Sequence, residues 1–290
     1  MTDIPASIVM KLRKMSGQGM MDCKRALQEA NGDIEQAMGV LRKKGLATLA
    51  KRAERETTEG TVVAWENANG RMAGIAVLRC ETDFVAKSDD FVQMVEAVKR
   101  GVQQCKADEG GDRLLETSVD GKKLNDMLTG LVSRTGEKIQ LVKEEYARYK
   151  LDGPGLISTY IHFNGKVGTM VEIETSDEAT AAADALRQTA SDIAMHITAT
   201  KPMSLDKDGI DPETIEQEKT IFAEQVKNKP ANIIDKIVEG KMKKFFAENC
   251  LLEQPFVKDD SKSVAQVLTE AAKQAGGEAK IKRFARFEVG

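Results

Sequence analysis

Apolar residues recur every three or four positions from Ile4 to about Leu46, which predicts a bundle of three short helices. Residues that stop or start helices bound these runs. In chain order they are Gly17-Gln18-Gly19, Asn31-Gly32, Asp33 with Gln36 as a capping-box pair, and Gly45 as the last helical end. A core of this size is only marginally stable. We therefore expect the helical module to present an apolar patch to a partner. Met20 and Met21 are the candidates, unless one of them belongs to the core.

After a basic linker helix that ends near residue 55, the hydrophobic period changes to that of strands. Residues 74–78 form an apolar run that follows the turn signal Asn69-Gly70, which predicts a buried strand of a β-hairpin. Past Val85 the period becomes helical. Thr82 and Asp83 therefore lie where a strand gives way to a helix, and either can cap a free backbone N–H there.

The segment 73–83 is repeated without a gap at 167–177, and each copy follows an Asn-Gly turn and precedes a helical pattern. The repeat predicts two similar α+β halves, each with an antiparallel sheet. The copies differ at one informative position, because Phe84 follows the first Asp and Glu178 follows the second. A core phenylalanine would be kept apolar in both halves. We therefore interpret Phe84 as a residue with a separate role, although a core position after a helix cap is the simpler alternative.

Asp211-Pro212 is a strong helix start, and a break at residues 228–230 separates two amphipathic helices that extend to about Asn249. So short a connection favours an antiparallel helical hairpin that projects from the body. The strand-like segments 251–256 and 284–289 are expected to rejoin the second sheet. The predicted division of the chain is a helical domain and linker at 1–55, subdomains at 56–152 and 153–290, and a coiled-coil hairpin at about 211–250.

Composition narrows the classes of function. The chain of 290 residues has a net charge of -3, so it lacks the basic excess typical of proteins that bind nucleic acid directly. It has no apolar run of the roughly 20 residues needed to span a bilayer, and no N-terminal signal segment. Its 4 cysteines are scattered without metal or redox spacing. We therefore expect a cytoplasmic protein with reduced cysteines and no membrane association.

Candidate catalytic chemistry is sparse. His162 and His196 are the only histidines, and neither belongs to a local catalytic or metal-binding motif. No phosphate-cradling glycine loop is present. The pattern favours an interaction protein without cofactor or metal, and an enzyme that uses His162 or His196 is the less favoured alternative.

Ordered motifs over nearly the whole chain carry a family resemblance. They are Gly17-Gln18-Gly19-Met20-Met21-Asp22-Cys23-Lys24, Thr82-Asp83-Phe84-Val85-Ala86, Asp192-Ile193-Ala194-Met195-His196-Ile197, and Lys236-Ile237-Val238-Glu239-Gly240-Lys241-Met242. In this order they closely resemble elongation factor Ts. None is decisive alone, but together they are very specific.

The resemblance implies a ubiquitin-associated-like N-terminal domain, two similar α+β subdomains and an inserted coiled-coil hairpin. It implies a guanine nucleotide exchange factor that binds elongation factor Tu with GDP, and no covalent chemistry. Residues matching the motif that intrudes beside the nucleotide and dislodges Mg²⁺ are Thr82, Asp83, Phe84 and Val85. Residues matching other partner contacts are Leu12, Met20 and Met21, and His162 in the second hairpin.

The alternative from another class is a ubiquitin-associated-like scaffold that binds a translation partner without exchanging its nucleotide. A 2:2 complex with elongation factor Tu, formed through the coiled-coil hairpin, is a further alternative. The sequence stops at Gly290, where some family members continue into a further helix, so contacts of such a helix are not expected here.

Overall fold

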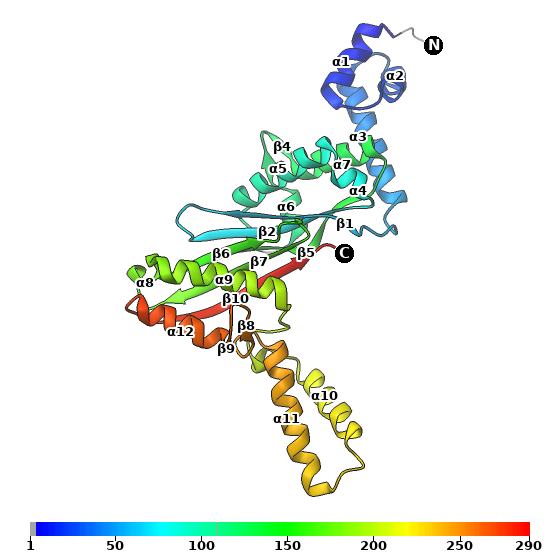
Figure 1. Cartoon of the computed structure of the whole chain (residues 1–290). Coiled ribbons are helices and arrows are strands. Elements are labelled where there is room, and N and C mark those ends of the chain that lie inside the picture. Colours follow the sequence, from blue (N-terminus) through cyan, green and yellow to red (C-terminus); the bar gives the residue numbers. More distant parts are fainter. Residues whose placement is uncertain (1–3, 109) are drawn as a thin grey trace.

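The computed structural model describes residues 4–108 and 110–290. Figure 1 shows an elongated molecule with a small helical module at one end and a helical hairpin at the other. Two three-stranded antiparallel sheets lie between them and are covered by helices. This arrangement confirms the predicted α+β fold.

The N-terminal module consists of α1 (Ala6–Ser16), α2 (Met20–Glu29) and α3 (Ile34–Lys51). Gly17 ends α1 as predicted, since it adopts a left-handed conformation with φ of 68°. The side chain of Asp33 accepts a hydrogen bond of 2.8 Å from the backbone N–H of Gln36 and so caps α3. The core of the module is small and aliphatic, as the sequence indicated.

The prediction that the third helix ends at Gly45 is wrong, because α3 continues to Lys51. Gly45 instead faces α7 (Leu124–Thr135), where a Cβ would lie 2.7 Å from the carbonyl oxygen of Thr129. The glycine therefore allows two helices to approach closely. Gln18 fixes the same contact by donating a hydrogen bond of 3.1 Å to the carbonyl of Gly130.

The first sheet has the strand order β1-β2-β5 and is covered on one face by helices. Its β1–β2 hairpin turns at Asn69-Gly70, as predicted, and Gly70 has φ of 66°. The elements of this half are β1 (Glu59–Glu66), β2 (Met72–Cys80), α4 (Asp83–Ala86), α5 (Asp89–Gln104), α6 (Gly111–Leu115), β3 (Ser118–Val119), β4 (Lys122–Lys123), α7 and β5 (Ile139–Lys150).

The second sheet has the strand order β10-β7-β6 and repeats the first topology. In each half a hairpin is followed by a long helix, a small two-stranded ribbon, a second helix and a returning strand. The elements are β6 (Gly155–Ile161), β7 (Val167–Thr175), α8 (Glu178–Ala182), α9 (Asp184–Thr200), η1 (Lys207–Gly209), β8 (Pro255–Phe256), β9 (Asp259–Ser263), α12 (Val264–Gln274) and β10 (Ala279–Glu288). The repeat predicted from the sequence is therefore structural.

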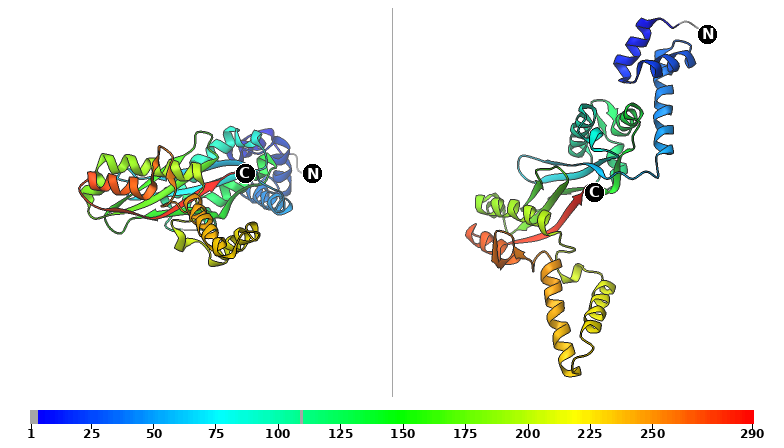
Figure 2. Two further views of the ribbon diagram at one scale, coloured as in Figure 1. Left: turned by 60° about the horizontal axis from the view of Figure 1, so that its bottom comes forward. Right: turned by 45° about the vertical axis from the view of Figure 1, so that its right-hand side comes forward.

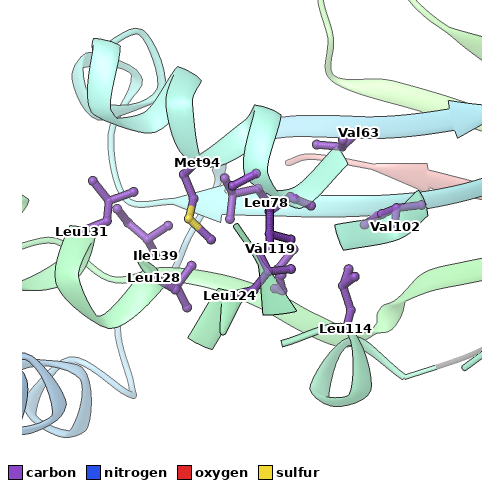
Figure 3. Close-up of a cluster of buried hydrophobic side chains, with 14 of the residues drawn as sticks. Val63, Leu78, Met94, Val102, Leu114, Val119, Leu124, Leu128, Leu131 and Ile139 are labelled. Carbon is purple, nitrogen blue, oxygen red and sulfur yellow. The ribbon is translucent and has the colours of Figure 1, made fainter. Parts of the chain in front are cut away.

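The two sheets pack face to face, which explains why β2 is apolar from Met72 to Leu78. Ala76, Leu78 and Cys80 point into a cluster under α5 and α7, part of which Figure 3 shows. Ile75 and Val77 point the other way, into a cluster shared with the second sheet. Because successive side chains of a strand face opposite sides, a strand buried on both faces loses the usual polar alternation.

The helical hairpin consists of α10 (Pro212–Gln225) and α11 (Ala231–Asn249) and projects from the second half (Figure 2). The side chain of Asp211 accepts a hydrogen bond of 3.1 Å from Glu213 N–H and caps α10, as predicted. The prediction that residues 251–256 rejoin the main sheet is wrong. They form turns and the strand β8, which pairs only with β9, and the missed helix α12 follows. The segment 284–289 does return to the sheet, within and just after β10.

No helix in the part of the chain that the structure describes is long and apolar enough to cross a membrane.

Candidate functional site

The predicted Thr82-Asp83-Phe84-Val85 motif begins at the turn after β2 and continues into the short helix α4. Thr82 caps α4 by accepting a hydrogen bond of 3.3 Å from Val85 N–H. Its hydroxyl donates to the carboxylate of Glu137 at 2.8 Å, and its backbone N–H donates to the same carboxylate at 3.2 Å. Glu137 precedes β5, so a residue distant in sequence fixes this turn. The local sequence around Thr82 gives no sign of Glu137.

Phe84 is 83% exposed, whereas the neighbouring Val85 packs against the first hydrophobic core. The turn is therefore anchored by one apolar side chain and displays the next one to solvent. The alternative that Phe84 is a core residue is wrong for this structure. A large, isolated aromatic side chain on a fixed turn is a feature that packing within the chain does not explain.

Asp83 forms an exposed ion pair of 2.8 Å with Lys87, one helical turn later. The hydrogen bond from Lys87 lowers the pKa of Asp83 below its ordinary value. Asp83 is therefore a carboxylate at neutral pH, and it carries its negative charge beside the exposed ring of Phe84.

Glu81 connects this turn to the basic linker segment. Its carboxylate accepts hydrogen bonds of 2.8 Å from both Arg52 and Arg55, and one of 2.6 Å from the backbone N–H of Lys138. Burial alone would raise the pKa of Glu81, but these donors outweigh it and lower the pKa to about 2. This role of Glu81 was not predicted from the sequence, in which the basic segment has the appearance of a linker.

The second predicted contact region is the turn between β6 and β7, which carries His162. The ring of His162 lies 4.4 Å from that of Phe163, and Phe163 is 91% exposed. Sequence reasoning missed Phe163, although its place before the Asn-Gly turn signalled exposure. Gly165 of this turn accepts a hydrogen bond of 2.8 Å from Val62 N–H.

The two exposed aromatic turns border the same strand. Glu59, at the start of β1, forms an ion pair with Lys166 of the β6–β7 turn. Glu59 is also the register partner of Cys80, two residues before Thr82. The structure thus brings the Phe84 and Phe163 turns to the same end of β1, although 79 positions separate them in the sequence.

The residues predicted to bind in the helical module differ in exposure. Met20 and Met21 are 43% and 65% exposed, so α2 does present a methionine patch. Leu12 is fully buried in the core of the module, and it has no free surface with which to contact a partner directly. The patch lies at the start of α2, just after Gln18, whose side chain donates a hydrogen bond of 3.1 Å to the carbonyl of Gly130 on α7.

His196 is a buried structural residue. Its Nε2 lies 2.9 Å from Oε1 of Gln254, and its Nδ1 accepts a hydrogen bond of 3.2 Å from Val257 N–H. Both ring nitrogens are therefore occupied. No group of three or more histidine, cysteine or acidic side chains that could hold a metal occurs among the described residues.

Exposed apolar side chains on fixed turns, spread over an elongated α+β molecule, are typical of a protein that binds another macromolecule. Residues 81–290 match the family model described as elongation factor TS. A Nitratiruptor protein named elongation factor Ts is 45% identical over 289 residues, which cover 99% of this chain and 93% of the relative. The protein of the same name from Nautilia profundicola is 42% identical, with 100% and 94% covered, and that from Nitratidesulfovibrio vulgaris is 38% identical, with 99% and 96% covered. The chain belongs to the elongation factor Ts family of translation elongation factors.

Proposed function

We propose that the chain is a guanine nucleotide exchange factor for elongation factor Tu and acts in the cytoplasm. It binds the GDP complex of that GTPase and promotes release of GDP by disturbing the Mg²⁺ and phosphate site. It performs no covalent chemistry and carries no cofactor of its own. Membership of the elongation factor Ts family supports the partner, and the exposed turn at Phe84 supports the mechanism.

The observation that carries the mechanism is the 83% exposure of Phe84 on a turn that Thr82, Glu137 and Val85 hold in place. A turn fixed in this way loses little backbone freedom when its exposed side chain inserts into a partner. Octahedral Mg²⁺ coordination tolerates little distortion, so a small displacement of a ligand loop weakens metal binding strongly. Phe84 therefore acts as the inserting group.

Phe84 alone cannot expel a tightly bound nucleotide. Nanomolar affinity corresponds to about 12 kcal/mol, whereas burying one phenylalanine contributes about 1.5–3 kcal/mol. The remaining free energy must come from a wider surface. The second aromatic turn, with His162 and Phe163, and the Met20-Met21 patch supply this surface in our proposal.

The test is the rate of release of fluorescent GDP from elongation factor Tu at several Mg²⁺ concentrations. The full chain should accelerate release strongly, and added Mg²⁺ should reduce the acceleration. Phe84→Ala should lower the maximal acceleration by about tenfold or more, equivalent to about 1.4 kcal/mol. Its complex with elongation factor Tu should still form.

Val257→Ala is the matched control, because Val257 is an apolar residue that is 46% exposed on the β8–β9 turn. It should exchange like the wild type. A Phe84→Ala protein that is as fast as the wild type at equal occupancy would contradict the insertion mechanism. If the wild type formed a stable complex but GDP left it no faster than it leaves elongation factor Tu alone, the chain would be a binder without exchange activity. Light scattering of the complex would test the 2:2 assembly.

A further inference from the structure

A polar pocket of about 490 Å³ lies away from the exposed turns. It is formed where the start of β2 and the end of β5 in the first sheet meet β10 of the second. Its described lining contains more cationic than anionic groups. The residues are Met72, Lys106, Asp108, Arg148, Lys150, Asp152 and Arg283.

The guanidinium group of Arg148 is poorly satisfied within the chain. Its side chain is only 11% exposed, and its Nη1 lies 3.6 Å from the carboxylate of Asp108, beyond hydrogen-bond distance. Its Nη2 contacts the sulfur of Met72 at 3.5 Å, and a thioether is a weak acceptor. Its Nε is buried without a hydrogen-bond partner among the described residues. A largely buried cation with so few acceptors is costly unless an anion joins it.

Arg79 shows how this chain satisfies an arginine of similar burial. The side chain of Arg79 is 13% exposed, and Glu145 accepts hydrogen bonds of 2.7 and 2.5 Å from its Nε and Nη2. Backbone carbonyls of Thr57 and Glu288 accept two more. Arg148 has no comparable carboxylate in the part of the chain that the structure describes, so its environment leaves room for an external acceptor.

Other cations surround the same space. The side chains of Lys106 and Lys150 are exposed, and neither forms an ion pair with another described residue. Arg283 lies over the ring of Tyr149 at 3.9 Å, and its Nε donates a hydrogen bond of 2.7 Å to Glu172, so its position in the pocket wall is fixed. Two exposed ammonium groups and a largely buried planar guanidinium match the needs of a phosphate group.

We propose that this pocket binds a small phosphate-type oxyanion, either a free phosphate or pyrophosphate, or the terminal phosphates of a nucleotide. The small number of cationic groups and the net negative charge of the chain favour a small anion over a nucleic-acid backbone. Because the lining comes from both sheets, the bound anion strengthens the contact between the two halves. The proposal is independent of exchange activity.

The test is isothermal titration calorimetry of the full chain, without any partner, with pyrophosphate, inorganic phosphate and GDP at constant ionic strength. Pyrophosphate should bind with a dissociation constant below about 1 mM and raise the melting temperature. Arg148→Gln should weaken binding by about tenfold or more, as expected for loss of a charge-assisted hydrogen-bonding group. Tighter binding of GDP than of pyrophosphate would identify a nucleotide as the source of the phosphate, and the reverse would identify a free anion.

Lys150→Gln tests the site without altering a buried residue, and it should weaken binding several-fold even if Arg148→Gln folds poorly. Lys273→Gln, an exposed change on α12, is the matched control and should bind like the wild type. Absence of binding of all three ligands at millimolar concentration would refute the proposal. So would binding that Lys150→Gln and a folded Arg148→Gln both leave unchanged.

Discussion

Phe84 and His196 illustrate opposite uses of an aromatic ring in this chain. Phe84 is displayed to solvent by a turn that polar hydrogen bonds hold in place, so its apolar surface is available to a partner. His196 is enclosed, and its two ring nitrogens connect α9 to Gln254 and to the β8–β9 turn. Gln254 in turn donates a hydrogen bond of 2.7 Å to the carbonyl of Glu248 near the end of α11. His196 thus supports the base of the helical hairpin.

We predict that His196 makes stability depend on pH. Burial lowers the pKa of His196 below its ordinary value of 6.5, so the unfolded chain binds the proton more readily than the folded chain. The stabilisation from neutral His196 is therefore present above about pH 6.5 and is lost as the pH falls through the lowered folded pKa. Thermal unfolding between about pH 7.5 and 5.5 should show this decline.

The variant His196→Gln should be less stable at neutral pH but should lose less stability on acidification. His162→Gln is the matched control, because it removes the other histidine from a surface turn. It should retain the slope of the wild type. Equal slopes for the wild type and His196→Gln would show that other groups cause the pH dependence.

At the scale of elements, the contact between α3 and α7 decides how the helical module is attached. Gly45 lets α3 approach the backbone of α7, and Gln18 adds a hydrogen bond to the same helix. Arg42 and Asp126 form an ion pair of 2.5 Å across the same junction. Close packing of the two helices and polar contacts therefore both attach the module to α7, in addition to the covalent connection through α3.

We predict that Gly45→Ala destabilises this contact by about 1–3 kcal/mol, because the new methyl group would overlap the backbone of Thr129. Gly39→Ala is the matched control in the same helix, since a Cβ there has no neighbour within 4 Å. It should stabilise α3 by up to about 1 kcal/mol. Hydrogen exchange of α1–α3 and urea unfolding measure both effects, and shifts of the same sign for the two variants would contradict the steric explanation.

At the scale of the whole molecule, the two halves are joined by packing between the sheets and by a few polar residues. Arg79 on β2 binds Glu145 on β5, and its Nη2 donates a hydrogen bond of 2.8 Å to the carbonyl of Glu288 at the end of β10. Its Nη1 also donates to the carbonyl of Thr57, which precedes β1. One side chain thus connects the entrance of the first half, its central and edge strands, and the last strand of the second half.

We predict that Arg79→Ala lowers the free energy of unfolding by about 2–4 kcal/mol, because it leaves Glu145 partly buried without its partner. Arg100→Ala removes an arginine from an exposed ion pair of 3.2 Å with Asp120 and should cost less than about 1 kcal/mol. Urea unfolding of both variants measures the difference. Similar losses would mean that Arg79 acts as an ordinary surface residue.

The sequence by itself determined most of the elements and the position of the main candidate site. Period changes and turn signals act within a few residues, so they located both hairpins, the helix after Thr82 and the helical hairpin. The repeat predicted that the two halves share one topology. The position that matches Phe84 in the second copy holds Glu178, which showed that the core does not require a phenylalanine there. These features are local, and local backbone preferences record them in the chain.

The tertiary structure decided what depends on contacts between distant segments. Gly45 has the sequence appearance of a helix end, but close packing on α7 gives it another role. Leu12 matches a binding motif, yet burial within the module removes it from the surface. Glu137 holds Thr82, and Nε of Arg148 lacks an acceptor among the described residues, only because strands distant in sequence are adjacent. Burial and hydrogen-bond partners arise from the pairing of such segments, so no local pattern could have predicted them.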